Sequence, residues 1–142
     1  MCGIIGNLNR NKLINQSEVN YFSNLTELMR TRGPDDKGYY LSNNKKVYLG
    51  HLRLSIIDLT NNASQPMTSS NGRYTLSFNG EIYNFSDLSK NLKNVDSVKL
   101  KSDTRVLIEY VTKFGVNKTL EDISGMFAIS VYDKQENKIY LA

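Results

Sequence analysis

The sequence contains few of the residue types on which many enzyme sites and small scaffolds depend. Its 142 residues include one cysteine, Cys2, one histidine, His51, and no tryptophan. A single cysteine cannot form an intrachain disulfide, so a disulfide scaffold is excluded. The usual structural zinc sites need four Cys or His ligands, and the sequence cannot supply them. A Ser-His-Asp or Cys-His enzyme would have to rely on His51 alone.

Long apolar runs and clustered charge are also missing. Lys and Arg number 18 against 14 Asp and Glu, a net charge of +4, but the lysines are scattered and do not alternate with aromatic residues. We therefore predict that the chain binds no nucleic acid. The apolar stretches are too short for a membrane span or a secretory signal, so we predict a cytoplasmic protein with a free thiol. The length is that of one domain.

The hydrophobic pattern predicts a chain of mixed strands and helices, α+β in class. A helix over residues 18–31 would begin at Ser17, and a second over 103–115 would begin at Ser102 and end at Gly115. A short helix is expected near residues 86–93. Strands are predicted over residues 2–8, 38–42, 46–57, 73–84 (as a pair), 126–133 and 138–142. Several of these strands are nearly continuous apolar runs, which indicates sheets covered on both faces, with helices outside.

Cys2 is the first candidate for chemistry. Removal of Met1 would leave a free α-amino group on the residue that carries the only thiol. A terminal amine has an ordinary pKa of about 7.7–8.0, so part of it is neutral near neutral pH and can act as a general base. No histidine is needed in such a site. The alternative is that Cys2 is simply a small buried apolar residue.

Three further features each allow two interpretations. Asn79-Gly80 is either the turn of a hairpin or a pair of donors for an oxyanion. Arg53, in an apolar strand, pairs either with a protein carboxylate or with a substrate carboxylate. Asp103 either complements a helix dipole or binds a ligand. Residues 32–36 are interpreted as a structured turn, and His51 as a structural histidine.

Several motifs together resemble one family. In chain order they are Met1-Cys2-Gly3-Ile4-Ile5-Gly6, Arg32-Gly33-Pro34-Asp35-Asp36, Gly50-His51-Leu52-Arg53-Leu54-Ser55-Ile56-Ile57-Asp58-Leu59, Gln65-Pro66-Met67, Phe78-Asn79-Gly80-Glu81-Ile82-Tyr83-Asn84, Ser102-Asp103-Thr104 and Gly125-Met126-Phe127-Ala128. This series resembles the glutaminase domain of glutamine-hydrolysing asparagine synthetases. The resemblance implies a class II glutamine amidotransferase domain, a four-layer αββα sandwich of the N-terminal-nucleophile hydrolase type.

The resemblance also implies a role for particular residues. Cys2 would be the nucleophile, and its α-amine would take the thiol proton. Asn79 and the Gly80 N–H would stabilise the oxyanion, and a γ-glutamyl thioester would form and be hydrolysed to glutamate. The remaining residues would bind glutamine: Arg53 its carboxylate, Glu81 and Asp103 its ammonium, and Leu54, Ser55, Ile56 and Ile57 the rest of the pocket. Glutamine hydrolysis would need no metal and no other cofactor.

In the family, the last strand continues and a large ATP-dependent synthetase domain follows. We therefore expect residues 1–142 to be a glutaminase domain that is incomplete at its C-terminus and lacks the synthetase domain. ATP and Mg would belong to that domain, which would be joined in cis and use the ammonia to make asparagine from aspartate. Alternatives are a related amidotransferase with another acceptor, in antibiotic or surface-polysaccharide synthesis, and a non-catalytic glutamine-binding or truncated module. A homodimer remains an open alternative.

Overall fold

The computed structural model describes residues 2–56, 61–92, 95 and 99–142. In this part of the chain the strands form two antiparallel sheets. The three-stranded sheet has the order β1-β3-β2 and consists of β1 Gly3–Leu8, β2 Asp36–Leu41 and β3 Val47–Arg53. The four-stranded sheet has the order β4-β5-β6-β7 and consists of β4 Met67–Thr68, β5 Tyr74–Ile82, β6 Gly125–Asp133 and β7 Lys138–Leu141. The helices are α1 Gln16–Glu27, α2 Phe85–Ser89, α3 Asp103–Phe114 and α4 Val116–Asp122, with 3₁₀ turns η1 Asn61–Ala63 and η2 Lys99–Lys101.

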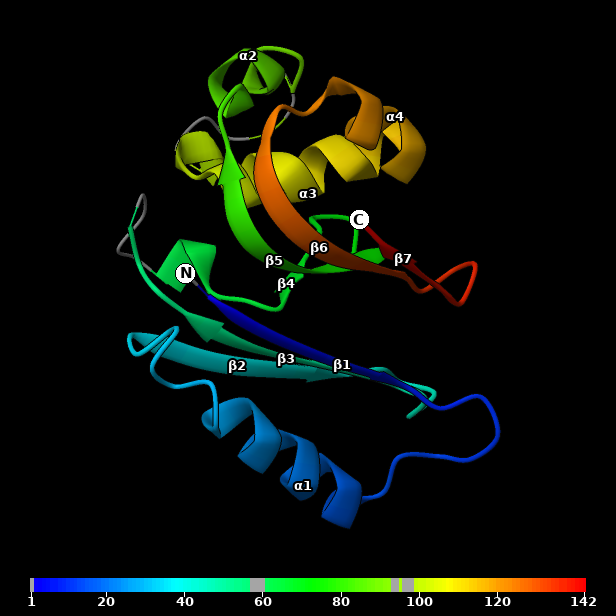
Figure 1. Ribbon diagram of the computed structural model, residues 1–142. Coiled ribbons are helices and arrows are strands. Elements are labelled where there is room, and N and C mark those ends of the chain that lie inside the picture. Colours follow the sequence, from blue (N-terminus) through cyan, green and yellow to red (C-terminus); the bar gives the residue numbers. More distant parts are fainter. Residues whose placement is uncertain (1, 57–60, 93–94, 96–98) are drawn as a thin grey trace.

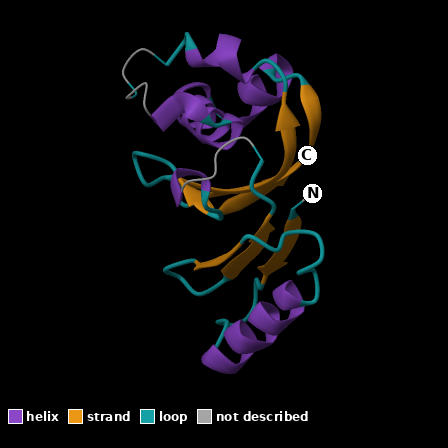
Figure 2. Cartoon of the chain, turned by 90° about the vertical axis from the view of Figure 1, so that its left-hand side faces the viewer, coloured by secondary structure: helices purple, strands orange, loops and turns teal. Residues whose placement is uncertain are grey.

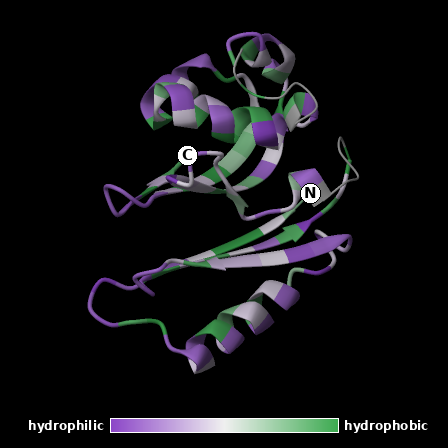
Figure 3. Cartoon of the chain, turned by 180° about the vertical axis from the view of Figure 1, so that it is seen from behind, coloured by the Kyte–Doolittle hydropathy of each residue, from purple (hydrophilic) through white to green (hydrophobic). Residues whose placement is uncertain are grey.

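The elements lie in layers (Figure 1). Helix α1 covers the outer face of the three-stranded sheet, and α2, α3 and α4 cover the outer face of the four-stranded sheet. The inner faces of the two sheets are turned toward each other, as the perpendicular view also shows (Figure 2). Hydrophobic residues run along the strands, whereas the loops at the ends of the sheets are largely hydrophilic (Figure 3). The prediction of sheets with helices outside them is confirmed at this level.

Strand β3 is buried along its whole length because it is the central strand of its sheet and is covered on both faces. Val47 and Leu49 pack against Tyr132 of β6, between the sheets, whereas Tyr48 packs against Ile14 and Val19 on the α1 side. Side chains alternate along a strand, so His51 and Arg53 share the inner face with Val47 and Leu49. This alternation brings Arg53 to the end of the space between the sheets.

Strand β5 has one apolar face and one polar face, and both faces are buried along the first half of the strand. Leu76, Phe78 and Ile82 join the core beneath α3. The intervening Thr75 and Ser77 are fully buried on the face that meets the other sheet. Asn79 follows on that same face, so the strand delivers an amide to the gap between the sheets.

Helix α1 differs from its predicted bounds at both ends. Asn15, rather than Ser17, caps it: the Asn15 side chain accepts from the Glu18 N–H, and the Glu18 carboxylate accepts from the Asn15 N–H. This reciprocal capping box satisfies two N–H groups, so the helix begins two residues earlier than predicted. It ends at Glu27, before the predicted residue 31.

The predicted strand pair over residues 73–84 is wrong. Asn79-Gly80 lies within one continuous strand, β5, which pairs along its length with β6. Long-range pairing with a strand almost fifty residues away therefore overrides the local hairpin signal of the Asn-Gly pair. The sequence prediction also missed α4, which follows Gly115 at a φ of 82°. Strand β3 ends at Arg53 instead of continuing to residue 57, which lies outside the described residues.

Candidate active site

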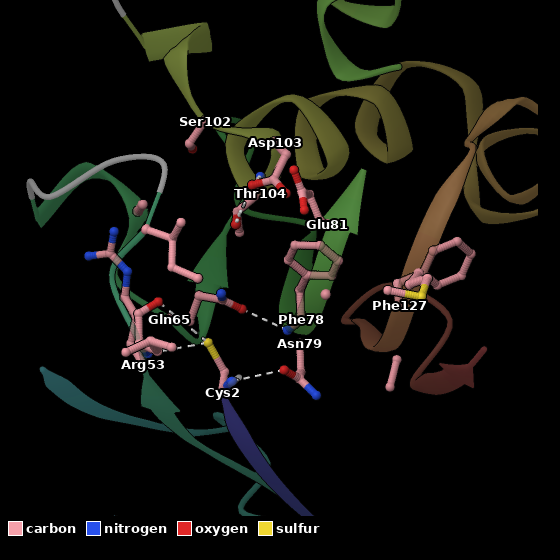
Figure 4. Close-up of a pocket in the computed structure, with 16 residues that line it drawn as sticks. Cys2, Arg53, Gln65, Phe78, Asn79, Glu81, Ser102, Asp103, Thr104 and Phe127 are labelled. Carbon is pink, nitrogen blue, oxygen red and sulfur yellow. Dashed lines mark hydrogen bonds between the residues drawn. The ribbon is translucent and has the colours of Figure 1, made fainter. Parts of the chain in front are cut away.

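A cavity of about 420 Å³ opens where β3 and β5 end and β1 and β6 begin, near the start of α3 (Figure 4). It gathers residues that are far apart in the sequence. Of the site residues predicted from the sequence, those that line it are Cys2, Arg53, Leu54, Ile56, Asn79, Gly80, Glu81 and Asp103. Ser55 is not among the lining residues, and Ile57 lies outside the described residues.

Cys2 stands immediately before β1 and faces the cavity. Its backbone N–H donates to Asn79 Oδ1 at 2.9 Å, which ties the first sheet to the second at this point. The Leu54 N–H points at Cys2 Sγ, with N and S 3.4 Å apart, and Sγ lies 3.9 Å from the Leu54 carbonyl oxygen. The sulfur is therefore held against the backbone that follows β3.

The turn over residues 32–36 fixes the segments on either side of Cys2. Arg32 Nε donates to the Cys2 carbonyl at 3.2 Å. The Asp35 carboxylate accepts from the Ser55 N–H at 2.7 Å, and the Asp35 N–H donates to the Arg53 carbonyl at 3.0 Å. A Cβ at Gly33 would overlap the Leu52 carbonyl, so only glycine allows this close approach. The prediction of a structured turn is confirmed, and the turn supports the site.

Gly80 has its backbone at the cavity wall. Its φ of 156° is rare for residues with a side chain, and a Cβ there would overlap the Met126 carbonyl oxygen of β6. Asn79 and Gly80 therefore lie next to each other in an extended strand. This excludes the hairpin interpretation of the pair and leaves the oxyanion interpretation.

Two charged groups of opposite sign lie on different sides of the cavity (Figure 4). Arg53 is only 6% exposed and lines one side. Asp103, 5% exposed, lines another; it accepts from the Thr104 N–H at 2.7 Å and from the Ile82 N–H at 3.2 Å. Burial raises the pKa of Asp103, and the negative charge of nearby Glu81 adds to this, although the backbone hydrogen bonds oppose it.

Some residues that line the cavity were not predicted as site residues from the sequence. These residues are Ala63, Gln65, Phe78, Ser102, Thr104, Met126, Phe127 and Ala128. All except Ala63 fall inside the motifs that carry the family resemblance, so those motifs were the available signal. Ile56 and Met126, both more than 70% exposed, lie at the open side of this lining.

Three aspartates at or near the cavity, Asp35, Asp36 and Asp103, accept hydrogen bonds from protein donors. Asp36, for example, accepts from the Ser64 hydroxyl at 2.7 Å. Within the described ranges, no group of three His, Cys, Asp or Glu side chains is placed to hold a metal ion. No helix in those same ranges has the length and apolarity to span a bilayer.

Comparison with known proteins identifies the family of the chain. The family model for the glutamine amidotransferase domain matches residues 1–142. The chain therefore belongs to the glutamine amidotransferase domain family.

The relatives are longer enzymes. Asparagine synthetase [glutamine-hydrolyzing] 2 of Bacillus subtilis is 34% identical over 99% of this chain and 18% of its own length. Asparagine synthetase B [glutamine-hydrolyzing] of Escherichia coli is 37% identical over 80% of this chain and 20% of its own length. Amidase chry2 of Gibberella zeae is 31% identical over 82% of this chain and 17% of its own length. The chain spans about a fifth of the length of these relatives.

Proposed function

We propose that this chain hydrolyses glutamine to glutamate and ammonia, with Cys2 as the nucleophile. The observation that carries the proposal is the convergence of Cys2, Asn79 and Gly80 on one cavity that also has a buried cation and a buried carboxylate. We further propose that the helix, sheet, sheet and helix layers are the four-layer αββα sandwich of the N-terminal-nucleophile hydrolases. The position of Cys2, immediately before β1 and hydrogen-bonded to Asn79 of the other sheet, supports this assignment.

The reaction begins once Met1 has been removed. The freed α-amine of Cys2 takes the thiol proton, directly or through a water molecule, and Sγ attacks the side-chain amide carbon of glutamine. The carbonyl π electrons move to the oxygen. Collapse of this tetrahedral intermediate breaks the C–N bond, and the amine returns its proton to the leaving ammonia. Water then hydrolyses the γ-glutamyl thioester to glutamate and restores the thiol.

The oxyanion of the intermediate needs donors already in place. The Cys2 nitrogen holds Asn79 Oδ1, which leaves the Asn79 Nδ2–H₂ free to face the reacting oxygen. The second donor is the Gly80 N–H at the cavity wall. One donor of this kind contributes about 3–4 kcal/mol of transition-state stabilisation.

The charged ends of glutamine match the charged groups of the cavity. Arg53 binds the α-carboxylate, for which a guanidinium offers two parallel hydrogen bonds. Asp103 and Glu81 bind the α-ammonium from another side. Leu54 and Ile56 line the remainder of the pocket. The thiol and amine of Cys2 and the hydrogen-bond donors of Asn79 and Gly80 carry the proposed steps. We propose no metal or cofactor for glutamine hydrolysis.

Two of the relatives named above are glutamine-hydrolysing asparagine synthetases. We therefore propose that this domain supplies ammonia to an ATP- and Mg-dependent synthetase domain in the same polypeptide, which makes asparagine from aspartate. A second candidate is a related amidotransferase with another acceptor, since a relative that is named an amidase and not an asparagine synthetase also matches this chain.

Cys2→Ala tests the proposed function. We expect the variant to fold and to bind glutamine, because alanine fits the same space, but to release no glutamate and form no thioester. Glutamate is measured by coupled assay, and the thioester by mass spectrometry of acid-quenched wild-type protein. A variant that still released glutamate would exclude Cys2 as the nucleophile. Glutamine binding without turnover by the wild-type chain, with Met1 removed, would instead indicate a non-catalytic binding module.

A further inference from the structure

The edge of β5 that faces the cavity is only partly covered by a strand. Strand β4 pairs with Thr75 and Leu76 and no further. Beyond Leu76, the backbone groups on this edge must find other partners, because buried N–H and C=O groups are costly when unpaired.

Two side chains from the other elements satisfy the peptide groups of Phe78 on this edge. Gln65 Oε1 accepts from the Phe78 N–H at 2.6 Å, and the His51 ring donates through Nε2 to the Phe78 carbonyl oxygen at 2.9 Å. Further along the strand, the Ile82 N–H donates to Asp103. In an antiparallel ladder the edge-facing groups recur at every second residue, so Gly80 is the intervening position. Its N–H therefore points to the cavity between two anchored neighbours.

The two anchoring side chains are themselves rigidly placed. His51 is fully buried in β3, and Gln65 is 5% exposed at the end of the loop before β4. Burial lowers the pKa of His51 and so favours the neutral ring, in which Nε2 must carry the N–H that the Phe78 carbonyl oxygen accepts. That N–H is committed to the Phe78 carbonyl, which leaves His51 no proton to exchange with a substrate.

We propose that His51 and Gln65 are positioning residues: by holding both peptide groups of Phe78, they set the depth at which Asn79 and Gly80 present their donors to the oxyanion. This role rests on the proposed function. His51 is in β3 and Gln65 in the following loop, so the three-stranded sheet and the loop locate a donor pair that belongs to the four-stranded sheet. A misplacement of about 1 Å in such a pair can cost on the order of 100-fold in rate.

The test compares variants that remove one hydrogen bond while keeping the side-chain volume. His51→Phe removes the donor and Gln65→Met removes the acceptor, whereas His51→Gln keeps an N–H near the position of Nε2. Val47→Ala is the matched control, since Val47 lies on the same face of β3 and is equally buried but packs against Leu49 and Tyr132. Steady-state kinetics with glutamine, thermal unfolding, and the affinities for glutamate and for glutamate γ-semialdehyde are measured for each. This aldehyde forms a tetrahedral adduct with the Cys2 thiol and places an oxygen at the oxyanion position.

We expect His51→Phe and Gln65→Met to lower kcat by about 10- to 100-fold with KM within about twofold of wild type. Aldehyde affinity should fall in parallel, glutamate affinity should not change, and His51→Gln should recover most of kcat. Val47→Ala should lower the unfolding temperature without changing kcat.

Two results would overturn the positioning role: unchanged kcat in folded His51→Phe and Gln65→Met, or a kcat loss in Val47→Ala as large as theirs. A wild-type chain, free of Met1, that hydrolyses no glutamine would overturn the proposed function itself, and the positioning role with it.

Discussion

Asn79 has a side-chain amide with two different ends. Its Oδ1 accepts from the Cys2 nitrogen at 2.9 Å, so the Nδ2–H₂ end is the one left for the proposed oxyanion contact. One hydrogen bond thus orients the amide and also fixes the start of β1 against β5. At the scale of single residues, the site depends on a few such double-ended contacts.

Asn79→Asp separates the two ends of this amide. Aspartate keeps an oxygen to accept from the Cys2 nitrogen but replaces the donor with a negative oxygen next to the developing oxyanion. We expect kcat to fall by about 100- to 1,000-fold, with little change in KM or in the unfolding temperature. Steady-state kinetics and calorimetry measure these effects. A kcat within fivefold of wild type would exclude Asn79 as an oxyanion donor.

Asp103 predicts how glutamine binding depends on pH. Burial, and then the charge of Glu81, hold the pKa of Asp103 above its ordinary 3.8, while only the ionised form attracts an ammonium group. KM for glutamine should therefore rise as the pH falls through this raised pKa, and it should be constant above it. In Asp103→Asn, we expect KM to be about 10- to 100-fold higher at neutral pH and no longer to rise in acid. An acid limb that persists in the variant would assign the titration to another group.

Helix α1 lies on the face of the three-stranded sheet opposite the site. Its contacts with Tyr48 stabilise the sheet, and its N-terminus is closed by the capping box of Asn15 and Glu18. At the scale of elements, α1 therefore contributes to stability and is separate from the chemistry.

The capping box gives a prediction with an internal control. Asn15→Ala removes the side-chain acceptor of the Glu18 N–H and should cost about 1 kcal/mol of unfolding free energy, a shift of roughly 2–5 °C. Ser17→Ala should have almost no effect, because Ser17 lies exposed inside the helix. Glutamine hydrolysis should be unchanged in both. Equal destabilisation by the two changes, measured by thermal unfolding, would contradict the assignment of the cap to Asn15.

At the scale of the whole molecule, an ion pair away from the site joins the two long strands. Arg73, just before β5, donates to the carboxylate of Asp133 at the end of β6, with Nη2 and Oδ2 2.6 Å apart. Burial alone would raise the pKa of Asp133, which is 1% exposed. Arg73 and the N–H groups of Glu136 and Gln135 together outweigh burial and hold that pKa below 3.8.

This ion pair predicts how global stability depends on acid. A carboxylate whose pKa is lowered by folding stabilises the folded state above its unfolded pKa, and this stabilisation is lost as the pH falls through the lower, folded value. Asp133→Asn should therefore cost about 2 kcal/mol at pH 7, and the difference from wild type should shrink below about pH 4. Urea unfolding across this pH range measures it. A difference independent of pH would show that Asp133 acts through packing rather than charge.

The local sequence determined where most helices, strands and turns lie, but it did not determine which strands pair with each other. The buried run of β3, the turn over residues 32–36 and the Ser102 cap of α3 are where the pattern predicts them, because caps, turns and periodicity depend on neighbouring residues. The strand pair over residues 73–84 was predicted wrongly, because the segment is one strand. Its Asn-Gly pair has a strong local turn preference, but pairing with β6 decides its conformation.

The site follows the same division. The sequence by itself determined which residues could do the chemistry: one thiol at Cys2, an amide and a glycine at residues 79–80, and a guanidinium at Arg53. It could not determine that Gln65 and His51 hold the Phe78 peptide, or that Asp103 is buried beside the cavity. Those facts depend on hydrogen bonds between two sheets and on burial, which exist only once distant segments pack. The sequence specifies which chemical groups are present. Tertiary packing sets the distances between them and the dielectric environment in which they act.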